Sequence, residues 1–313
     1  RNGEVCFLRV CPISEKQKSN ILAELEFIDY LRGKGYPALE PVPTKFGEQL
    51  IQKDTPWGEY FASVFKRVKG EAISEAGFDD MIIYIYGATL GQLHQLSREY
   101  TSPKTKRWSY VDVLNWIEET LHNLTLGEPA LEELKLLREC FSSLPITPSS
   151  FGLVHYDFET DNVFYVAETN TCSVIDFDDA MYHWYIMDIV QALDSLQAEI
   201  PGSEFSQKQT VFLEGYRSKY ELDEKLLATM PIFRRFASLY GSVRSARSIQ
   251  EQWDNEPTWL VELREKLTHM IAIEKAGFSV AVDAVNSVGG VVMPALLKAL
   301  GVKNVVEINC EPT

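Results

Sequence analysis

Apolar runs near the start of the chain predict a small sheet packed with one helix. Apolar residues run almost without interruption from Val5 to Val10, and shorter strand-like runs follow at 49–52 and 60–66. Between the first two runs, apolar residues recur at helical spacing over 15–34, and glycines after that stretch supply a stop. We therefore expect three strands and one helix within residues 1–69.

Helical spacing dominates the chain from residue 71 onward. The first helix is expected over 79–98, with one apolar face. Further helices are predicted over the ranges 109–125, 129–143, 184–197, 205–220, 223–249 and 256–275. His94 lies on the apolar face of the first helix, where a histidine is more often packed with a satisfied hydrogen bond than catalytic.

Residues 151–188 interrupt the helices with strand-like runs that are punctuated by acids. Val163–Val166 and Cys172–Ile175 are joined by a turn rich in Glu, Thr and Asn, which predicts a hairpin. His155-Tyr156-Asp157 and Asn162 precede this hairpin, and Asp176-Phe177-Asp178-Asp179 ends it. An acidic hairpin that binds no metal is the simpler interpretation.

The same acids allow phosphoryl transfer, which needs a metal clamp on the phosphates and a carboxylate that orients the attacking hydroxyl. Asp157 is spaced to be that carboxylate. Asn162 and Asp176 form a pair of hard oxygen ligands suited to Mg²⁺, and Asp178 is a candidate further ligand.

The strings VHYDFETDNVF and VIDFDDA resemble the catalytic core of the aminoglycoside phosphotransferase and choline kinase-like family of small-molecule kinases. Tyr156 stands where that family usually has glycine. The resemblance covers about residues 4–275. It implies an α+β, bilobal protein-kinase-like fold, with a small antiparallel lobe over 1–69 and a mainly helical lobe over 70–276. It also implies ATP and Mg²⁺ as cofactors.

Further site residues follow from the same resemblance. Arg9 stands where the family usually has the strand lysine that holds the α- and β-phosphates, and Glu24 is the expected partner, to be distinguished from Glu26. Phe65 and Arg67 resemble the hinge that an adenine contacts through the backbone. Asp188 matches an aspartate that braces the catalytic loop.

The small lobe is expected to be incomplete. In the resembled family the strand at Val5–Val10 is the third strand, and neither two earlier strands nor a glycine-rich phosphate loop occurs in this sequence. The leading hypothesis is ATP-dependent phosphorylation of a hydroxyl on a small polar metabolite or aminocyclitol antibiotic. The alternative is a non-catalytic nucleotide- or ligand-binding module, which the absent loop and Arg9 favour. The sequence leaves ATP or GTP open.

Composition narrows the partners. The net charge of −15 argues against nucleic acid and an anionic membrane surface as partners, and it is compatible with a cationic small substrate. A loop with Trp253, Asp254, Glu256 and Trp259 could meet an amine, or could simply begin a helix with packing tryptophans. The five cysteines include no C-x-x-C pair, and no signal peptide or membrane span is visible, so a cytoplasmic protein is expected. The oligomeric state stays open.

Residues 277–313 depart from the kinase pattern. They read as strand, glycine turn, helix and strand, which predicts a βαβ unit. The segment resembles the opening of one domain of the α-D-phosphohexomutases, but without their catalytic phosphoserine and metal loop. Because so few residues cannot bury a core alone, we interpret the segment as a fragment unrelated to the kinase lobes, and predict no mutase activity.

Overall fold

The computed structural model describes residues 4–56, 58–102, 104, 106–124, 128–250, 258–276, 279–283 and 304–308. Contacts divide the chain into two compact units. One unit contains residues 1–116 and 133–237, and the other contains 117–132 and 238–313. The boundaries predicted from the sequence, at 69 and 276, stay predictions. All of the candidate catalytic residues fall in the first unit.

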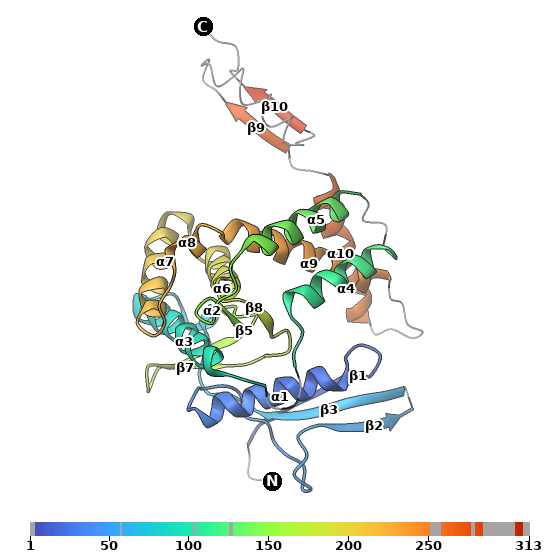
Figure 1. Cartoon of the computed structure of the whole chain (residues 1–313), viewed down its shortest axis with the longest axis vertical. Coiled ribbons are helices and arrows are strands. Elements are labelled where there is room, and N and C mark those ends of the chain that lie inside the picture. The colour runs from blue at the N-terminus through green and yellow to red at the C-terminus, as the bar shows by residue number, and fades with distance from the viewer. Residues whose placement is uncertain are drawn as a thin grey trace. The chain divides into compact units, whose positions relative to one another are not determined.

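The first sheet is antiparallel and has the strand order β1-β3-β2. Its strands are β1 (Cys6–Pro12), β2 (Ile51–Thr55) and β3 (Gly58–Lys66). The helix α1 (Lys18–Gly33) runs beside this sheet (Figure 1) and ends before Gly35, whose φ of 80° is left-handed. The predicted small antiparallel sheet with one helix is therefore confirmed.

Two further sheets of short strands flank the loops that contain Asp157 and Asp176. β5 (Phe151–Val154) pairs with β8 (Met181–Trp184), while β6 (Val163–Val166) pairs with both β7 (Thr171–Val174) and β4 (Glu71–Ala72), all antiparallel. The predicted hairpin is the β6–β7 pair. The sequence prediction missed β4 and β8, and it wrongly placed Trp184 at the start of a helix.

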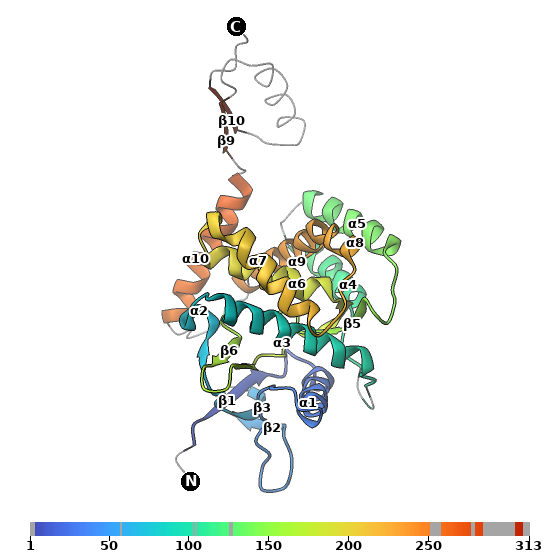
Figure 2. The ribbon, with the colours of Figure 1, turned by 90° about the vertical axis from the view of Figure 1, so that its left-hand side faces the viewer.

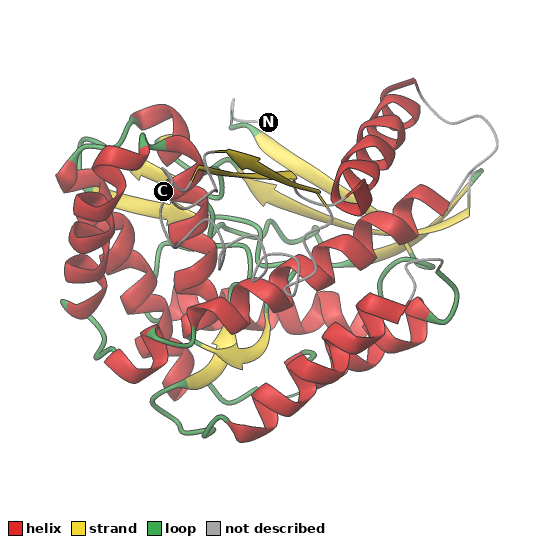
Figure 3. Ribbon diagram, turned by 90° about the horizontal axis from the view of Figure 1, so that it is seen from above, coloured by secondary structure: helices red, strands yellow, loops and turns green. Residues whose placement is uncertain are grey.

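Helices make up most of the first unit outside these strands (Figure 3). They and the helices of the rest of the described chain are α2 (Ile73–Ala76), α3 (Asp80–Glu99), α4 (Tyr110–Leu121), α5 (Glu128–Ser143), α6 (Ile186–Glu199), α7 (Gly202–Arg217), α8 (Glu224–Leu227), α9 (Met230–Gln250) and α10 (Thr258–Ala276). The single helix predicted over 223–249 is wrong, because α8 and α9 are separate. Pro231 explains the break, since its ring would clash with the carbonyl of Leu227 in a continuous helix.

The last described strands are β9 (Ser279–Asp283) and β10 (Asn304–Ile308), which pair in parallel. Parallel pairing of these two strands is what the predicted βαβ unit requires. The helix predicted between them lies outside the described residues, and the resemblance to a phosphohexomutase fragment stays a prediction.

Glycines let α3 and α7 approach closely in the first unit (Figure 2). A Cβ added at Gly87 of α3 would overlap the carbonyl of Phe212, and one added at Gly215 of α7 would overlap the carbonyl of Tyr84. This crossing fixes α3, which in turn packs on the loop that bears Asp157, because Tyr86 stacks on Phe158 at 5.2 Å and donates to its carbonyl.

Gly87→Ala is expected to reduce the free energy of unfolding by about 1 to 3 kcal/mol, the usual cost of overpacking. The backbone carbonyl that the new methyl group meets cannot turn aside as a side chain would. Gly241→Ala in α9 is the matched control, because a Cβ there meets nothing within 4 Å. Urea denaturation checks both, and equal effects would show that the α3–α7 crossing is less tight than its backbone geometry indicates.

Candidate active site

The loop after β5 holds Asp157 and Asn162 against each other. The Asn162 side-chain amide donates to the Asp157 carboxylate at 2.9 Å and to the Asp157 carbonyl at 3.0 Å. These bonds use the side-chain nitrogen of Asn162 and leave its side-chain oxygen for another partner. The five-residue spacing recognised in the sequence thus closes the loop into one unit that presents two side chains together.

The fully buried Asp188 holds this loop through hydrogen bonds to its backbone. The Asp188 carboxylate accepts the backbone N–H of His155 at 2.8 Å and that of Tyr156 at 2.7 Å. It also lies 3.0 Å from Nε2 of His94, whose Nδ1 meets the Tyr216 hydroxyl at 2.8 Å. The predicted brace is present, and His94 is the packed, hydrogen-bonded histidine that the sequence indicated.

The unusual residue of the loop has a left-handed backbone. Tyr156 has φ 68°, a conformation that glycine adopts freely and that a larger residue adopts at some cost. This explains why glycine is the usual residue here in the resembled family. In this chain the strained backbone is held on both sides, because Asp188 accepts the Tyr156 N–H and Gln191 donates to its carbonyl at 2.8 Å.

Backbone hydrogen bonds bring Asp176 to the same loop. Ile175 donates its N–H to the Asn162 carbonyl at 3.0 Å, and its own carbonyl lies 2.8 Å from Nε2 of His155. Asp176 follows directly, with a left-handed φ of 59°. The chain next to Asp176 is therefore fixed to both ends of the catalytic loop, although β7 and β5 lie in different sheets.

Two buried rings anchor the acids. Phe158 follows Asp157 and Phe177 follows Asp176, and neither ring is exposed to solvent. Both contact the His155 imidazole, with ring centroids 5.6 and 4.5 Å apart. Each of the two acids thus precedes an aromatic ring that is fixed in the core.

The carboxylates share one electrostatic environment. Burial raises the pKa of Asp157 to about 7, and the negative charges of Glu159, Asp179 and Asp176 add to the shift, against the Asn162 hydrogen bond. A positive charge placed among these acids would lower that pKa again. The cluster therefore favours a cation.

The ligands present fit Mg²⁺. The Asn162 amide oxygen and the Asp176 carboxylate are hard oxygen donors on adjoining backbone, and Mg²⁺ commonly binds one or two such groups and takes its other ligands from phosphates and water. Within the described ranges, no group of three or more His, Cys, Asp or Glu side chains is arranged to hold a metal ion. A magnesium site that takes its remaining ligands from phosphates and water does not need three protein side chains of this kind.

Arg9 and Glu24 form the pair predicted for the small lobe. Two guanidinium nitrogens of Arg9 donate to the two Glu24 oxygens at 2.8 and 2.7 Å, and Glu24 is fully buried. Burial disfavours the charge of Arg9, but Glu24 and then Asp176 raise its pKa overall. The guanidinium also lies 5.0 Å from the centre of the Phe65 ring. The pairing is with Glu24 and not Glu26.

In the predicted hinge around Phe65 and Arg67, some backbone N–H groups already donate hydrogen bonds within the protein. Phe65 is buried, and its ring lies against the Arg9 guanidinium. The backbone N–H of Lys66 donates to the backbone carbonyl of Glu40, and that of Arg67 donates to the backbone carbonyl of Val5. An adenine would have to use other backbone groups of this segment. A role for Phe65 and Arg67 in nucleotide binding stays a prediction.

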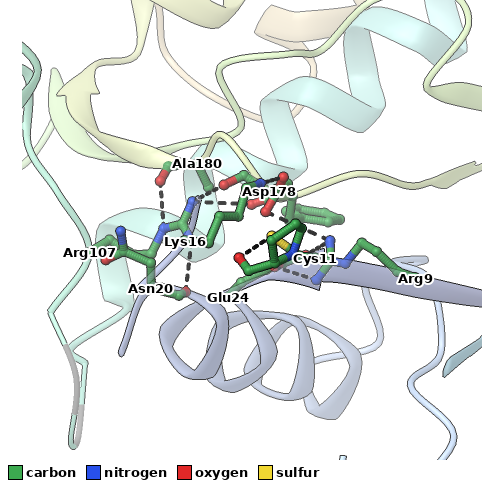
Figure 4. Close-up of polar contacts among 10 residues, drawn as sticks. Arg9, Cys11, Lys16, Asn20, Glu24, Arg107, Asp178 and Ala180 are labelled. Carbon is green, nitrogen blue, oxygen red and sulfur yellow. Dashed lines mark hydrogen bonds and ion pairs between the residues drawn. The ribbon is translucent and has the colours of Figure 1, made fainter. Parts of the chain in front are cut away.

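Asp178 faces cations. Its carboxylate lies 3.8 Å from Arg9 and forms an ion pair with Lys16, on the loop between β1 and α1 (Figure 4). Arg107 holds the backbone around it by donating to the carbonyls of Asp178 and Ala180. Sequence reasoning missed both Lys16 and Arg107, because neither belongs to a motif and each partner is remote in the chain.

The acidic loop with tryptophans that could meet an amine lies mostly outside the described residues. Trp253, Asp254 and Glu256 lie outside the described residues, while Trp259 lies in α10 with 63% of its surface exposed. Across the part of the chain that the structure describes, every helix is too short or too polar to cross a membrane.

Because the Asp157 pKa is about 7 in the folded protein against an ordinary 3.8, ionisation of this group opposes folding. The folded state binds a proton at Asp157 between these pH values, whereas the unfolded state does not. The penalty therefore grows as the pH rises from about 4 to 7 and is complete above 7. Asp157→Asn, which carries no charge, is expected to raise the free energy of unfolding at pH 8.

Urea denaturation of both proteins at pH 5 and at pH 8, without nucleotide or metal, checks this. The stabilisation by Asp157→Asn should shrink as the pH falls from 8 to 5. A gain of equal size at both pH values would show that packing, and not the charge of Asp157, is responsible.

Comparison of the sequence with known proteins finds a family model and a similar protein. A model described as the phosphotransferase enzyme family matches residues 2–222. The amicoumacin kinase of Bacillus subtilis (strain 168) is 23% identical over 299 residues, which cover 90% of this chain and 86% of that protein.

Solved structures show the same fold. Amicoumacin kinase hAmiN, in complex with AMP-PNP, Ca²⁺ and Ami, has a TM-score of 0.70 at 24% identity, covering 86% of this chain and 83% of its own. The microcompartment-associated aminopropanol kinase has a TM-score of 0.60 at 21% identity, covering 87% and 84%. These similarities confirm the predicted α+β, protein-kinase-like fold.

Proposed function

We propose a specific reaction for this chain, which belongs to the phosphotransferase enzyme family. The protein transfers the γ-phosphoryl group of ATP to a hydroxyl of a small, amine-bearing molecule. The observation that carries the proposal is the assembly of Asp157, Asn162 and Asp176 on one loop system. The similarity to an amicoumacin kinase supports a small-molecule acceptor, and the similarity to an aminopropanol kinase supports one that carries an amine.

Asp157 orients the acceptor. Its carboxylate, held by Asn162, accepts a hydrogen bond from the acceptor hydroxyl and takes the proton as the new O–P bond forms. The bond between the γ-phosphorus and the β,γ-bridging oxygen breaks at the same centre, and ADP leaves with that oxygen. Burial raises the pKa of Asp157, which makes its carboxylate a stronger base for the hydroxyl proton.

Asn162 and Asp176 would hold the cofactor metal through their side-chain oxygens. Mg²⁺, when bound, neutralises charge on the β- and γ-phosphates. Arg9 supplies a fixed positive charge for the phosphate chain, because its fork is clamped by the buried Glu24. Asp188 keeps the loop in place by accepting the N–H groups of His155 and Tyr156.

Acids beside Asp157 favour a cationic acceptor. Glu159 is half-buried two residues after Asp157, and burial, followed by the charge of Asp161, raises its pKa. An ammonium group nearby would relieve this repulsion, and the net charge of −15 draws cations towards the protein as a whole. The same cluster of negative charge that favours a metal ion thus supports an amine-bearing acceptor.

Phosphate transfer from ATP, with GTP in parallel, to a panel of hydroxyl compounds tests the proposal. The panel pairs amines such as aminopropanol, choline, homoserine and aminoglycosides with neutral sugars of similar size. We expect Mg²⁺-dependent transfer to at least one amine and to none of the sugars, and transfer about 10²-fold or more slower with Asp157→Asn protein. Thermal stabilisation by Mg²⁺–ATP without transfer to any compound would favour the non-catalytic binding module instead.

A further inference from the structure

Two cations from different segments share one carboxylate at the edge of the site. Arg9 comes from β1 and Lys16 from the following loop, and both lie against the side chain of Asp178 (Figure 4). A single anion thus holds two positive groups close enough that both could contact one phosphate chain. Outside this chain's own residues, phosphate oxygens are the anions expected in a phosphotransferase site.

The two acids of this cluster differ in how readily they can be displaced. Glu24 is fully buried and grips Arg9 through two bonds of 2.8 and 2.7 Å. Asp178 is 24% exposed and reaches Arg9 at only 3.8 Å. Arg9 and Lys16 are themselves 30% and 33% exposed, so solvent reaches both cations. An incoming anion would therefore displace Asp178 and leave Glu24 in place.

The four paired side chains of the cluster carry no net charge. Arg9 and Lys16 carry two positive charges, and Glu24 and Asp178 carry two negative ones. Further negative charge acts on the same cations, from Asp176 on Arg9 and from Asp179 on Lys16. Withdrawal of the Asp178 side chain from the pair would therefore remove one of the negative charges that oppose a triphosphate.

Arg107 links the loop that bears Asp178 to the start of α1. It donates to the Ala180 carbonyl at 2.6 Å and to the Asp178 carbonyl on one side, and to the Asn20 carbonyl at 2.8 Å on the other (Figure 4). These bonds are to backbone, so the Asp178 side chain can move while its loop remains attached to α1. The frame that positions Lys16 is thus independent of the ion pair itself.

We propose that Lys16 is a second phosphate-binding residue, which joins Arg9 on the phosphate chain of the nucleotide, and that Asp178 is the counter-ion that the phosphates displace. The inference rests on the proposed function, because it takes the nucleotide as the ligand. It gives Asp178 a role other than the metal ligation that the sequence suggested.

Calorimetric titration of ATP, ADP and AMP, each with and without Mg²⁺, tests the role of Lys16 without relying on activity. Lys16→Gln should weaken ATP and ADP about tenfold or more, the usual value of a charge-assisted hydrogen bond, and should leave AMP nearly unchanged. Lys16→Arg should retain most of the affinity. Lys18→Gln is the matched control, since Lys18 is exposed two residues away and its loss changes the net charge equally.

Asp178→Asn tests the counter-ion. It should strengthen the binding of metal-free ATP about threefold or more, because a competing negative charge is removed. A metal ligand would behave in the opposite way, and its loss would weaken Mg²⁺–ATP without helping metal-free ATP. Thermal unfolding of each variant confirms that the fold is retained.

The outcomes separate this inference from the proposed function. Wild-type affinity in Lys16→Gln, or equal losses in Lys16→Gln and Lys18→Gln, would overturn the role of Lys16 while the kinase proposal stands. Weaker metal-free binding in Asp178→Asn would overturn the counter-ion. Failure of the wild-type protein to bind any of these nucleotides would overturn the proposed function, and this inference with it.

Discussion

Asp157→Asn is expected to reduce kcat by a factor of about 10² to 10⁴, the usual contribution of a general base. Asparagine has the same shape as aspartate, and Asn162 can still donate to its oxygen, so the loop should keep its geometry. The amide cannot take the proton of the acceptor hydroxyl. Since Asp157 is proposed to contact the acceptor and not the phosphates, the affinity for Mg²⁺–ATP should barely change.

Asp176→Asn provides the contrast that assigns the two roles. It should also reduce kcat, but it should weaken Mg²⁺–ATP and leave metal-free ATP unaffected, because a carboxylate ligand is lost from the metal. Glu168→Gln is the matched control, as it removes a charge from the exposed turn between β6 and β7 with no proposed contact to the acceptor, the metal or the nucleotide. Steady-state kinetics and ATP titrations on the three variants decide the matter. Equal binding losses at Asp157 and Asp176, or none at either, would show that the roles are wrongly assigned.

Local signals explain why the sequence predicted so much of this site. The spacing from Asp157 to Asn162 is set by a loop that closes on itself through hydrogen bonds, so it must recur wherever that loop is used. The β6–β7 hairpin has apolar strands and a turn with Asn170 at φ 51°, which is the turn chemistry that the sequence indicated. The pairing of Arg9 with Glu24 was implied by the resemblance to the kinase family, and the structure shows that bond.

Other features depend on tertiary structure and leave no local pattern. β4 has two residues, too few for an apolar period to be recognised. β8 pairs with β5, a strand far earlier in the chain, so no turn of the kind that joins β6 to β7 marks it. Arg107 acts on carbonyls 70 or more residues away, and nothing in its neighbours distinguishes it from a solvent-exposed arginine. Tyr156 could be noted as a departure from glycine, but only the folded loop shows that its backbone is left-handed.

Asp188→Asn is expected to reduce the free energy of unfolding by about 2 to 3 kcal/mol. The Asp188 carboxylate is fully buried and accepts the backbone N–H groups of His155 and Tyr156 through separate oxygens. An amide has one oxygen, and its NH₂ group would face a second donor, so at least one buried N–H would lose its partner. The loop bearing Asp157 would lose its support, and kcat should fall as well.

Asp194→Asn is the matched control, because Asp194 lies on the same helix α6 but is 38% exposed and pairs with Arg234, itself 40% exposed, at 2.6 Å. Loss of such a surface pair should cost less than about 1 kcal/mol and leave kcat unchanged. Urea denaturation and steady-state kinetics on both variants make the comparison. If the two substitutions cost the same, the buried carboxylate does not brace the loop, and the left-handed backbone of Tyr156 must be held by other contacts, such as the bond from Gln191 to its carbonyl.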